Sequence, residues 1–366
     1  PGDLIPLRNR TISECLSASY SRGSYIIMPK VTSDSASIRR VAVIGSGLAG
    51  LVSAILLKEQ GHQVTVFEKS RGPGGRLSSK RVGDTGSVDI GAQYFTIRDP
   101  AFHAFLQTWA GDDTFSEWPG RFGFQHPQEG WQPFPDEARY VGTPRMTAVS
   151  RALSKHVDLA AQVRIARLIR EDGYWQLLCT EDRDQGRFDQ VIITAPPAQA
   201  QQILDDSGLA PMVDRVSDSA GLMLPCWAVA ARLDDAVPLA YEGFRPDSDT
   251  LYWVANNASK PGREQGGGWW VLHATPEWTN HHLETDPDLI AERLIGAFRD
   301  ITGYAGDVSE QIAHRWLYAR STDGGCPGYL WDGSEGLGLA GDWLAGGRVE
   351  GAWESAANLV AAMKED

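Results

Sequence analysis

Gly45, Gly47 and Gly50 have the spacing of a phosphate-binding loop. They form a G-x-G-x-x-G pattern between a β-branched run and an apolar helical pattern. In such a loop the first glycine permits a tight turn, the second lets the backbone approach a pyrophosphate, and the third lets the helix pack against the strand. The unpaired N–H groups at the helix N-terminus would face the phosphates. These residues predict a dinucleotide-binding site.

An acidic residue and a second glycine cluster follow this loop. Glu68 ends the next apolar run, where its carboxylate can accept hydrogen bonds from ribose hydroxyls. The chain continues as RGPGGR over 71–76, which a nicotinamide dinucleotide would not require. A flavin dinucleotide extends further across the sheet edge, where glycines such as Gly75 and the guanidinium of Arg76 could serve its phosphates. The alternative is a flexible loop with a solvated arginine.

A third candidate element lies near the C-terminal end. Gly341 and Asp342 end a strand predicted from 337. The Asp342 carboxylate could accept a hydrogen bond from a ribityl chain or bind phosphate through water. A helix predicted over 349–363 would direct its positive end at the N1 and C2 oxygen of a flavin, which stabilises the anionic reduced ring. A surface glycine loop before a C-terminal helix is the alternative.

The elements that must position these residues alternate between strands and helices. Strand-like runs recur over 40–45, 63–68, 163–169, 174–180 and 189–194. A helix predicted over 48–60 joins the first two runs into a β-α-β unit. Thr143 and Pro144 have the residue types of an N-cap and a first helical position, so we predict a helix from there to about residue 156.

Composition and charge exclude several kinds of partner. Lys and Arg number 34 against 47 Asp and Glu, so the formal net charge is −13 and a nucleic-acid backbone would be repelled. The longest apolar stretch, 222–231, is shorter than the roughly 20 residues of a membrane helix. The four cysteines are scattered without a Cys-x-x-Cys motif, which fits a reducing compartment and supports no metal cluster. We therefore expect a cytoplasmic protein with no metal, membrane or nucleic-acid partner.

Taken together, the motifs resemble those of the amine-oxidase-like flavoproteins of the glutathione-reductase type, and most closely the renalases among them. The resemblance rests on segments in a fixed order, namely GGRLSS, VDIGAQYF, YVGTPRMTAVSRAL, FDQVIITAPP, VLHATPEW, and CPG ahead of AGDW. It covers about residues 38–363. It implies noncovalently bound FAD and an α/β fold, in which a Rossmann-like FAD-binding domain carries an inserted mixed α+β substrate domain.

The length and the order of segments divide the chain into two lobes, since 366 residues are many for one core. We assign 38–98, 144–200 and 311–366 to the FAD-binding domain. The Trp-rich stretches 99–143 and 201–310 are assigned to the substrate domain. Residues 1–37 lack apolar periodicity, so we expect a leader or extension outside the fold, with a transit peptide as the alternative.

The resemblance also implies the individual site residues. The cofactor-binding set, besides the glycines and Asp342, comprises Ala49, Glu68, Lys69, Arg76, Gln93 and Tyr94, with the adenine end near Val163. Asn257 and His273 are implied as a polar pair beside the flavin ring. Without the resemblance, His273 would be interpreted as a buried strand histidine satisfied by the backbone. Tyr94, Trp253 or Trp270 could wall the pocket.

The activity implied is the oxidation of isomeric dihydronicotinamide dinucleotides. Hydride at ring carbon 2 or 6 of reduced NAD(P) moves to flavin N5, NAD(P)+ is released, and O2 takes the electrons as H2O2. This chemistry needs the two rings stacked within about 3.5 Å and shielded from water rather than a strong base. Asn257 and His273 would orient the substrate carboxamide.

Two other functions stay open. The first is a flavin amine or polyamine oxidase, because DGGCPG resembles the sequence through which monoamine oxidases attach flavin covalently to a cysteine. Here Pro327 follows Cys326, and this departure argues against covalent attachment. The second is a non-catalytic flavin-binding redox module, which the acidic charge and scattered tryptophans do not exclude.

Overall fold

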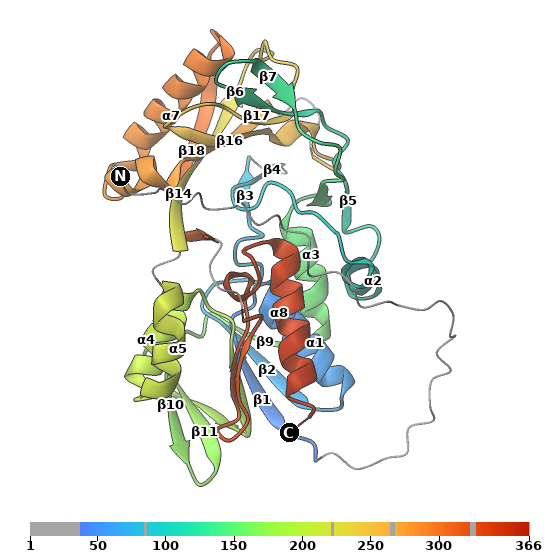
Figure 1. The fold of residues 1–366 in the computed structure, drawn as a ribbon, viewed down its shortest axis with the longest axis vertical. Coiled ribbons are helices and arrows are strands. Elements are labelled where there is room, and N and C mark those ends of the chain that lie inside the picture. The colour runs from blue at the N-terminus through green and yellow to red at the C-terminus, as the bar shows by residue number, and fades with distance from the viewer. Residues whose placement is uncertain (1–36, 84–85, 221–222, 264–267, 323–326, 366) are drawn as a thin grey trace, which may run out of the picture. The chain divides into compact units, whose positions relative to one another are not determined.

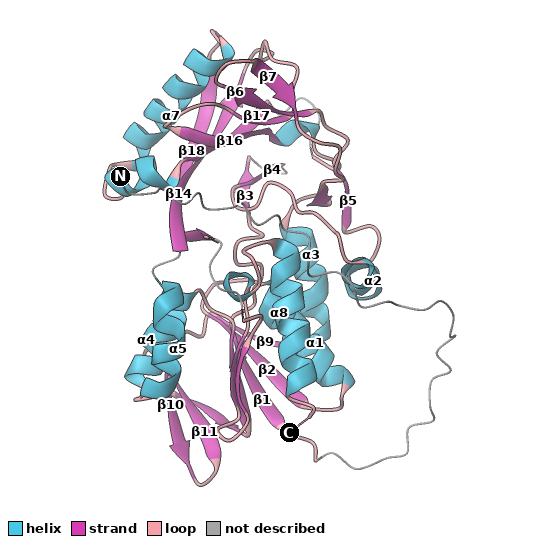
Figure 2. Cartoon of the chain, in the orientation of Figure 1, coloured by secondary structure: helices cyan, strands magenta, loops and turns pink. Residues whose placement is uncertain are grey.

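The structure of the protein is a computed structural model that describes residues 37–83, 86–220, 223–263, 268–322 and 327–365. The predicted leader, apart from Ser37, and Cys326 lie outside the described residues. Within them the chain forms two large sheets, three smaller ones and eight α-helices (Figures 1 and 2). No helix in these ranges is long and apolar enough to cross a membrane, and no group of their side chains could hold a metal ion.

The first large sheet has six strands in the order β19-β20-β13-β1-β2-β9. The strands are β1 (Arg40–Ile44), β2 (Gln63–Glu68), β9 (Asp158–Ala161), β13 (Gln190–Ile193), β19 (Leu330–Asp332) and β20 (Leu337–Leu339). All neighbours are parallel except β19 and β20. Side chains alternate across this sheet, so that Val41 and Val43 join one hydrophobic cluster while Ala42 and Ile44 join another.

Layers on both faces explain why the central strands are apolar along their length. One cluster packs against the helices α1 (Leu48–Glu59), α3 (Thr147–Leu153) and α8 (Val349–Ala362), which lie together in Figure 1. The other packs against a three-stranded antiparallel sheet, β10 (Ile165–Glu171), β11 (Tyr174–Cys179) and β12 (Asp184–Phe188), with helices α4 (Pro197–Asp206) and α5 (Ala210–Ala220). The first β-α-β unit lies within about one residue of its predicted bounds.

The second large sheet has seven strands in the order β18-β14-β17-β16-β15-β6-β7. Their bounds are β6 (Phe122–His126), β7 (Gly130–Pro133), β14 (Met223–Leu233), β15 (Gly243–Arg245), β16 (Leu251–Asn256), β17 (Trp269–Ala274) and β18 (Val308–Ser321). One face packs on α7 (Pro287–Thr302). The other packs on a hairpin, β3 (Ser79–Val82) and β4 (Gly86–Asp89). The remaining elements are α2 (Pro100–Trp109), α6 (Pro276–His281), β5 (Phe115–Glu117), β8 (Tyr140–Gly142) and three short 3₁₀ turns, η1 (Ser154–His156), η2 (Asn257–Ser259) and η3 (Asp342–Leu344).

The strand pairings bear on the domain boundaries, and the division into two domains stays a prediction. Strand β18 pairs with β14 in the seven-stranded sheet, although we assigned the chain from residue 311 to the FAD-binding domain. Helix α4 extends past residue 200 and packs beside β10 on the side of the six-stranded sheet. The return to the first sheet therefore comes at β19.

Helix α3 begins three residues later than predicted. Thr143 is not its N-cap, because the helix starts at Thr147 and has no side-chain cap from its own N-cap residue. Instead, the carboxylate of Asp89 accepts a hydrogen bond from the Met146 N–H at 2.9 Å, and the Ser79 hydroxyl accepts one from Thr147 N–H at 3.3 Å. The β3–β4 hairpin thus supplies the cap that the local sequence was expected to provide.

Candidate functional site

A cavity of about 1730 Å³ lies between the carboxyl ends of the parallel strands and the seven-stranded sheet. Ile44, Glu68 and Thr194 line it from β1, β2 and the residue after β13, while Trp253 and His273 line it from β16 and β17. Open α/β sheets bind ligands at this edge. Ordinary ligand pockets measure roughly 300–1,000 Å³. The cavity therefore has room for a dinucleotide and a second ligand.

The first glycine loop turns at the edge of this cavity. A Cβ on Gly50 would lie 1.9 Å from the backbone oxygen of Gly45, so Gly50 is needed for close packing of α1 on the loop. A Cβ on Gly47 would meet nothing within 4 Å, and Gly45, Gly47 and Ala49 line the cavity. Helix α1 has no side-chain N-cap and no acidic residue in its first turn. Its N-terminal N–H groups are thus suited to phosphate.

The second glycine cluster lies against the first. Gly74 N donates to Ser46 O at 3.0 Å, and a Cβ on Gly75 would lie 3.5 Å from the Gly47 Cα. Gly74 and Gly75 both have positive φ, at 134° and 53°, where a residue with a side chain is strained. The backbone of 72–76 lines the cavity beside the α1 N-terminus. This arrangement lengthens the phosphate site beyond the first loop.

Glu68, Lys69 and Val163 come together at one end of the cavity. Glu68 is buried, and its carboxylate accepts hydrogen bonds from Ser46 N at 3.0 Å, Ser46 Oγ at 2.7 Å and Ser70 N at 2.7 Å. Val163 N donates to the backbone oxygen of Glu68. Burial lowers the pKa of Lys69, and the positive charge of Arg164 lowers it further against the opposing effect of Glu68. This end combines a ribose acceptor with cationic side chains.

Arg76 and Asp342 form a two-point ion pair at the cavity wall. Arg76 Nη1 lies 2.9 Å from Asp342 Oδ2, and Nη2 donates to Oδ1. Gly341 N donates to Ser355 Oγ of α8 at 3.0 Å, and Gly347 N donates to the backbone oxygen of Asp342 at 2.7 Å. The first residue of α8 and Gly347 line the cavity, and the helix has no side-chain N-cap. The positive end of α8 therefore faces the cavity, and its predicted role beside a flavin ring stays a prediction.

His273 and Trp253 face the cavity from directly opposed positions on β17 and β16. The His273 ring hydrogen-bonds with the backbone of Ile90, while its Nε2 and the Nε1 of Trp253 are buried without a partner among the described residues. Burial lowers the pKa of His273 to about 4, with a further contribution from the positive charge of Lys260. At neutral pH the imidazole is therefore uncharged, and its Nε2 and the Nε1–H of Trp253 are available to a ligand.

Two residues assigned to the ring end of the site do not line the cavity. Asn257 is buried, its Oδ1 accepts from Asp89 N at 3.1 Å, and its Nδ2 donates to Ser87 O at 3.2 Å. Trp270 packs on the opposite face of the seven-stranded sheet, where its ring centroid lies 5.7 Å from that of Phe298. Tyr94 and Trp253 do line the cavity, with ring centroids 5.3 Å apart.

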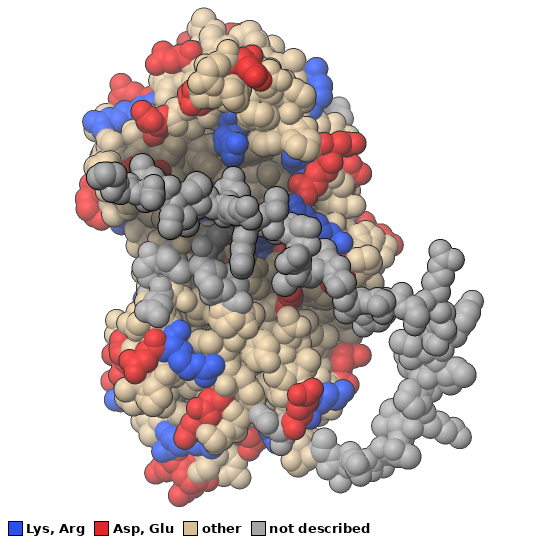
Figure 3. All heavy atoms as spheres, in the orientation of Figure 1, with Lys and Arg blue, Asp and Glu red and all other residues tan. Residues whose placement is uncertain are grey.

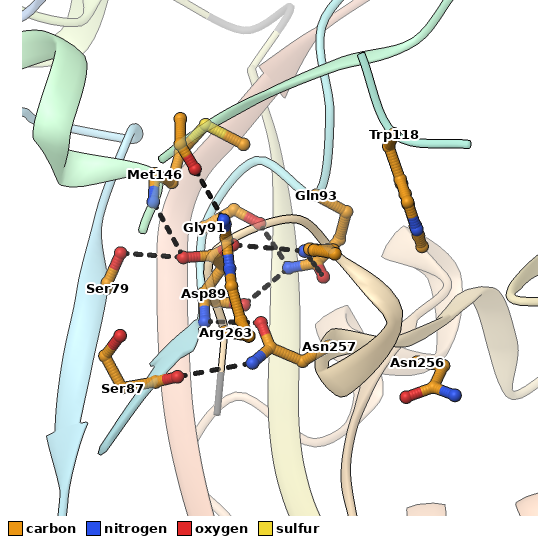
Figure 4. A network of polar contacts seen from close by, with 12 residues as sticks. Ser79, Ser87, Asp89, Gly91, Gln93, Trp118, Met146, Asn256, Asn257 and Arg263 are labelled. Carbon is orange, nitrogen blue, oxygen red and sulfur yellow. Dashed lines mark hydrogen bonds and ion pairs between the residues drawn. The ribbon is translucent and has the colours of Figure 1, made fainter. Parts of the chain in front are cut away.

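Gln93 lines the cavity and belongs to a polar network that the sequence did not predict (Figure 4). The side chain donates from Nε2 to Asp89 O at 2.6 Å and Gly91 O at 2.9 Å. Its Oε1 accepts a hydrogen bond from Lys260 Nζ at 3.0 Å. Asp89, Lys260 and Arg263 form a buried ion cluster here. Loop-like sequence around Lys260 gives no signal of this burial.

The cavity is basic although the chain as a whole is acidic. On the face drawn in Figure 3, acidic side chains are scattered over the outer surface. The basic lining residues of the seven-stranded sheet and the hairpin are Lys80, Arg81, Arg245, Arg315 and Arg320. The acidic residues among the described lining are Glu68, Asp206 and Asp342, all on the side of the six-stranded sheet. The local field favours anionic ligands.

The fold and the cavity define an α/β protein of the dinucleotide-binding class that carries a second large sheet, and sequence comparison agrees on the class. Residues 43–109 match the model of an NAD(P)-binding Rossmann-like domain. Residues 134–363 match the model of the flavin-containing amine oxidoreductases. The chain belongs to the flavin-containing amine oxidoreductase family. This family indicates FAD as the cofactor, and the α/β fold class predicted from the sequence is confirmed.

Curated relatives share only short segments with this chain. A 1-hydroxycarotenoid 3,4-desaturase from Flavobacterium sp. (strain P99-3) is 42% identical over 60 residues, which are 16% of this chain and 12% of the relative. A flavin-dependent L-tryptophan oxidase from Lentzea aerocolonigenes is 48% identical over 73 residues, which are 20% of this chain and 15% of the relative. The chain thus matches less than a sixth of the length of these relatives.

Solved structures show the fold over most of the chain. A putative protoporphyrinogen oxidase from Exiguobacterium sp. 255-15 has a TM-score of 0.68 at 13% identity. Cyclohexylamine oxidase from Brevibacterium oxydans IH-35A has a TM-score of 0.68 at 14% identity. In both comparisons 90% of this chain and 99% of the other chain are covered.

Residues around the cavity fit FAD on their own geometry. The two glycine loops lie in contact, and the open space at Gly47 lets a phosphate approach the uncapped α1 N-terminus. Glu68 and Val163 mark one end of a continuous cavity, and the uncapped N-terminus of α8 faces it further along. An extended dinucleotide needs a binding site for its ribose at one end of the cavity and for its flavin ring at the other. The roles of the individual residues remain our proposal, as does noncovalent attachment, because Cys326 is not described.

Proposed function

We propose that the chain is an FAD-dependent oxidase of 2- or 6-dihydro isomers of NAD(P), which yields β-NAD(P)+ and, with O2, H2O2. The renalases that the sequence resembles carry out this reaction. The observation that carries the proposal is the positive charge on the substrate side of the cavity. A dinucleotide substrate is anionic through its pyrophosphate, whereas an amine substrate is cationic.

Two arginines on the seven-stranded sheet contribute this charge. The Arg320 guanidinium carbon lies 4.1 Å from the centroid of the Tyr252 ring, and that of Arg245 lies 5.7 Å from the centroid of the Phe134 ring. Neither arginine has an ion-pair partner in the described part of the chain. At an effective dielectric of about 20, one unit charge 4 Å from another contributes about 4 kcal/mol. This effect repels a protonated amine and attracts a phosphate.

The neutral state of His273 supports the same substrate. Within the described part of the chain, Nε2 of the uncharged imidazole and Nε1–H of Trp253 are buried without a partner, so they can hydrogen-bond a neutral carboxamide. When bound, FAD supplies the hydride acceptor N5 and passes the electrons to O2. The aromatic side chains of Tyr94 and Trp253 limit water access and hold a flat ring. No strong base is required of the chain.

A flavin amine oxidase is the second candidate, since the family model carries that chemistry in its name. The aromatic wall of Tyr94 and Trp253 favours it, because an apolar amine could also pack there. Against it, the described lining residues provide no carboxylate on the substrate side to pair with an ammonium group.

Anaerobic reduction of the bound flavin distinguishes the candidates. The purified protein is mixed with 2- or 6-dihydro-NAD(P), with β-NADH, and with cyclohexylamine or putrescine, and the loss of flavin absorbance is followed. We expect rapid bleaching by a dihydro isomer alone. Bleaching by an amine alone would establish the amine oxidase, and no bleaching by any of these would favour a non-catalytic flavin module.

Arg320→Met tests the charge argument, with Arg232→Met as its control. Arg232 is paired with Glu310 at 2.7 Å on the exposed side of β14 and does not line the cavity. Losing a charge-assisted contact worth about 1.5–3 kcal/mol should raise the half-saturating concentration of the dihydro isomer roughly ten- to hundredfold. The control should leave that concentration unchanged. An equal effect of both variants would contradict a role for Arg320 in substrate binding.

A further inference from the structure

A buried ion cluster lies directly behind the part of the cavity wall formed by 91–94. It consists of Asp89 at the end of β4, with Lys260 and Arg263 after η2. The side chains of Asp89 and Lys260 are fully buried, and that of Arg263 is 2% exposed. Lys260 Nζ lies 3.2 Å from Asp89 Oδ2, and Arg263 Nη2 donates to the same oxygen. Figure 4 shows Asp89, Gln93 and Arg263 converging at this point.

Among the described residues, the cluster holds two cations and one anion. The other carboxylate oxygen of Asp89 is satisfied by Met146 N at 2.9 Å and Ser79 Oγ at 2.7 Å. Burial raises the pKa of Asp89, but Lys260, Arg263 and these hydrogen bonds hold it below its ordinary value, so the carboxylate is charged. Burial lowers the pKa of Lys260 to about 8, which leaves the ammonium mostly protonated at neutral pH.

Burying the additional positive charge of Lys260 costs free energy. An ion pair of Asp89 with Arg263 alone would be neutral, and Lys260 adds one positive charge with full desolvation. The Trp118 ring, 5.2 Å from Lys260 Nζ, offsets part of this cost through a cation–π contact. A purely structural role would be served as well by an apolar side chain of similar length.

The cluster is connected to the cavity through Gln93. Lys260 donates to Gln93 Oε1, and both N–H groups of the Gln93 amide are taken by Asp89 O and Gly91 O. The amide therefore has one orientation, with its oxygen toward the ammonium group. Lys260 also lies close enough to His273 for its charge to lower the pKa of that imidazole. Its field thus reaches the face on which the substrate would bind.

We propose that Lys260 is a positioning residue that locks the Gln93 amide at the cavity wall and supplies a positive charge, in excess of the single carboxylate that the described cluster contains, which favours negative charge on a ring bound there. For FAD this means that Lys260 makes the bound cofactor easier to reduce. The proposal rests on FAD binding in this cavity and is therefore tied to the proposed function. It concerns a residue for which the family resemblance assigned no role.

The test compares three variants. Lys260→Met removes the charge with little change in length, Lys260→Arg keeps the charge but alters the shape, and Lys58→Met removes an exposed lysine on α1 outside the cavity lining. The midpoint potential of bound FAD is measured by anaerobic dye titration. The pKa of His273 is measured by NMR in the FAD-free protein. We expect Lys260→Met to shift the potential negative and to raise the His273 pKa, while the other two variants keep wild-type values.

Different results of these measurements would overturn the role of Lys260 and the binding of FAD. An unchanged potential and His273 pKa in Lys260→Met would overturn the role of Lys260, as would an equal shift in Lys260→Arg, which indicates a role in packing only. If Lys260→Met does not fold, Lys260→Gln is compared with Lys260→Arg in the same way. Failure of the wild type to bind FAD would overturn the proposed function, while the His273 measurement would still test the charge of Lys260.

Discussion

Separate replacement of Gly47 and Gly50 with alanine should show that Gly47 faces the ligand and that Gly50 is needed for packing. A Cβ at Gly50 would lie 1.9 Å from Gly45 O and 2.8 Å from Thr194 Oγ1, so α1 or the loop must move. Overpacking of this kind costs about 1–3 kcal/mol. At Gly47 the Cβ would meet nothing, and φ of −68° is accessible to alanine. The stability cost there should be about 1 kcal/mol or less, from the loss of a glycine N-cap.

Gly50→Ala should lose more stability than Gly47→Ala, whereas Gly47→Ala should lose more affinity for FAD. The methyl group added by Gly47→Ala would occupy the open space through which phosphate approaches the α1 N-terminus. One charge-assisted hydrogen bond lost in this way costs about 1.5–3 kcal/mol. Gly47→Ala should therefore bind FAD roughly ten- to hundredfold more weakly. Urea unfolding of the FAD-free variants and fluorescence titration with FAD measure the two quantities. Wild-type FAD affinity in Gly47→Ala, or a greater loss of stability there than in Gly50→Ala, would contradict the assignment of Gly47 to phosphate binding and Gly50 to packing.

Four further predictions concern the cofactor and the ring end of the cavity. Glu68→Ala should cost about 1–3 kcal/mol of FAD affinity through lost ribose hydrogen bonds; undiminished FAD retention on dilution would contradict this. Trp253→Phe should cost about 0.5–3 kcal/mol of unfolding free energy through lost packing of the buried ring, since Nε1 has no partner to lose among the described residues, and should slow flavin reduction by the dihydro isomer; an unchanged rate would remove Nε1 from the site. His273 has a pKa of about 4 when folded against 6.5 ordinarily, so the unfolded chain binds more protons between these values and stability falls as the pH drops through them. Over this pH range the free energy of unfolding of His273→Phe should fall by up to about 3 kcal/mol less than that of the wild type. Parallel curves of stability against pH for the two proteins would contradict the lowered pKa of His273. Acid precipitation should release free flavin, whereas colour that stays with the precipitate would indicate covalent attachment, for which Cys326 is the candidate.

The first β-α-β unit could be predicted because its determinants are local. Glycine spacing sets the turn, and the period of apolar residues sets the flanking strand and helix. Strand β1 and helix α1 accordingly lie within one residue of the predicted bounds. The contact between the two glycine loops follows from the same local signals, since both loops leave the carboxyl ends of adjacent strands, β1 and β2.

The start of α3 depends on a distant residue and could not be predicted locally. Thr143 and Pro144 have the composition of a helix start, but the hydrogen bond that fixes Met146 comes from Asp89, 57 positions away. The same residue organises the buried cluster with Lys260 and Arg263. Charged residues in a loop-like sequence are normally exposed, so nothing in the sequence indicated that these three would be buried together.

The ring end of the site shows where family resemblance and strand geometry differ. Successive side chains of a strand point to opposite faces, so Trp270 and His273, three positions apart, cannot both face the cavity. The pattern alone does not say which face does. Asn257 lies past the end of β16, where the backbone of β4 is close enough to hydrogen-bond both the oxygen and the nitrogen of its side-chain amide. Trp253, directly opposite His273, lines the cavity as the sequence suggested.

We propose that FAD lies in the basic cavity, with room for an anionic dinucleotide beside it. Anaerobic single-turnover reduction with a 2- or 6-dihydro isomer of NAD(P), set against putrescine at the same concentration, tests it most directly. We expect the isomer to bleach the flavin rapidly and the polyamine to leave it oxidised. Rapid reduction by putrescine, with no response to either isomer, would contradict it.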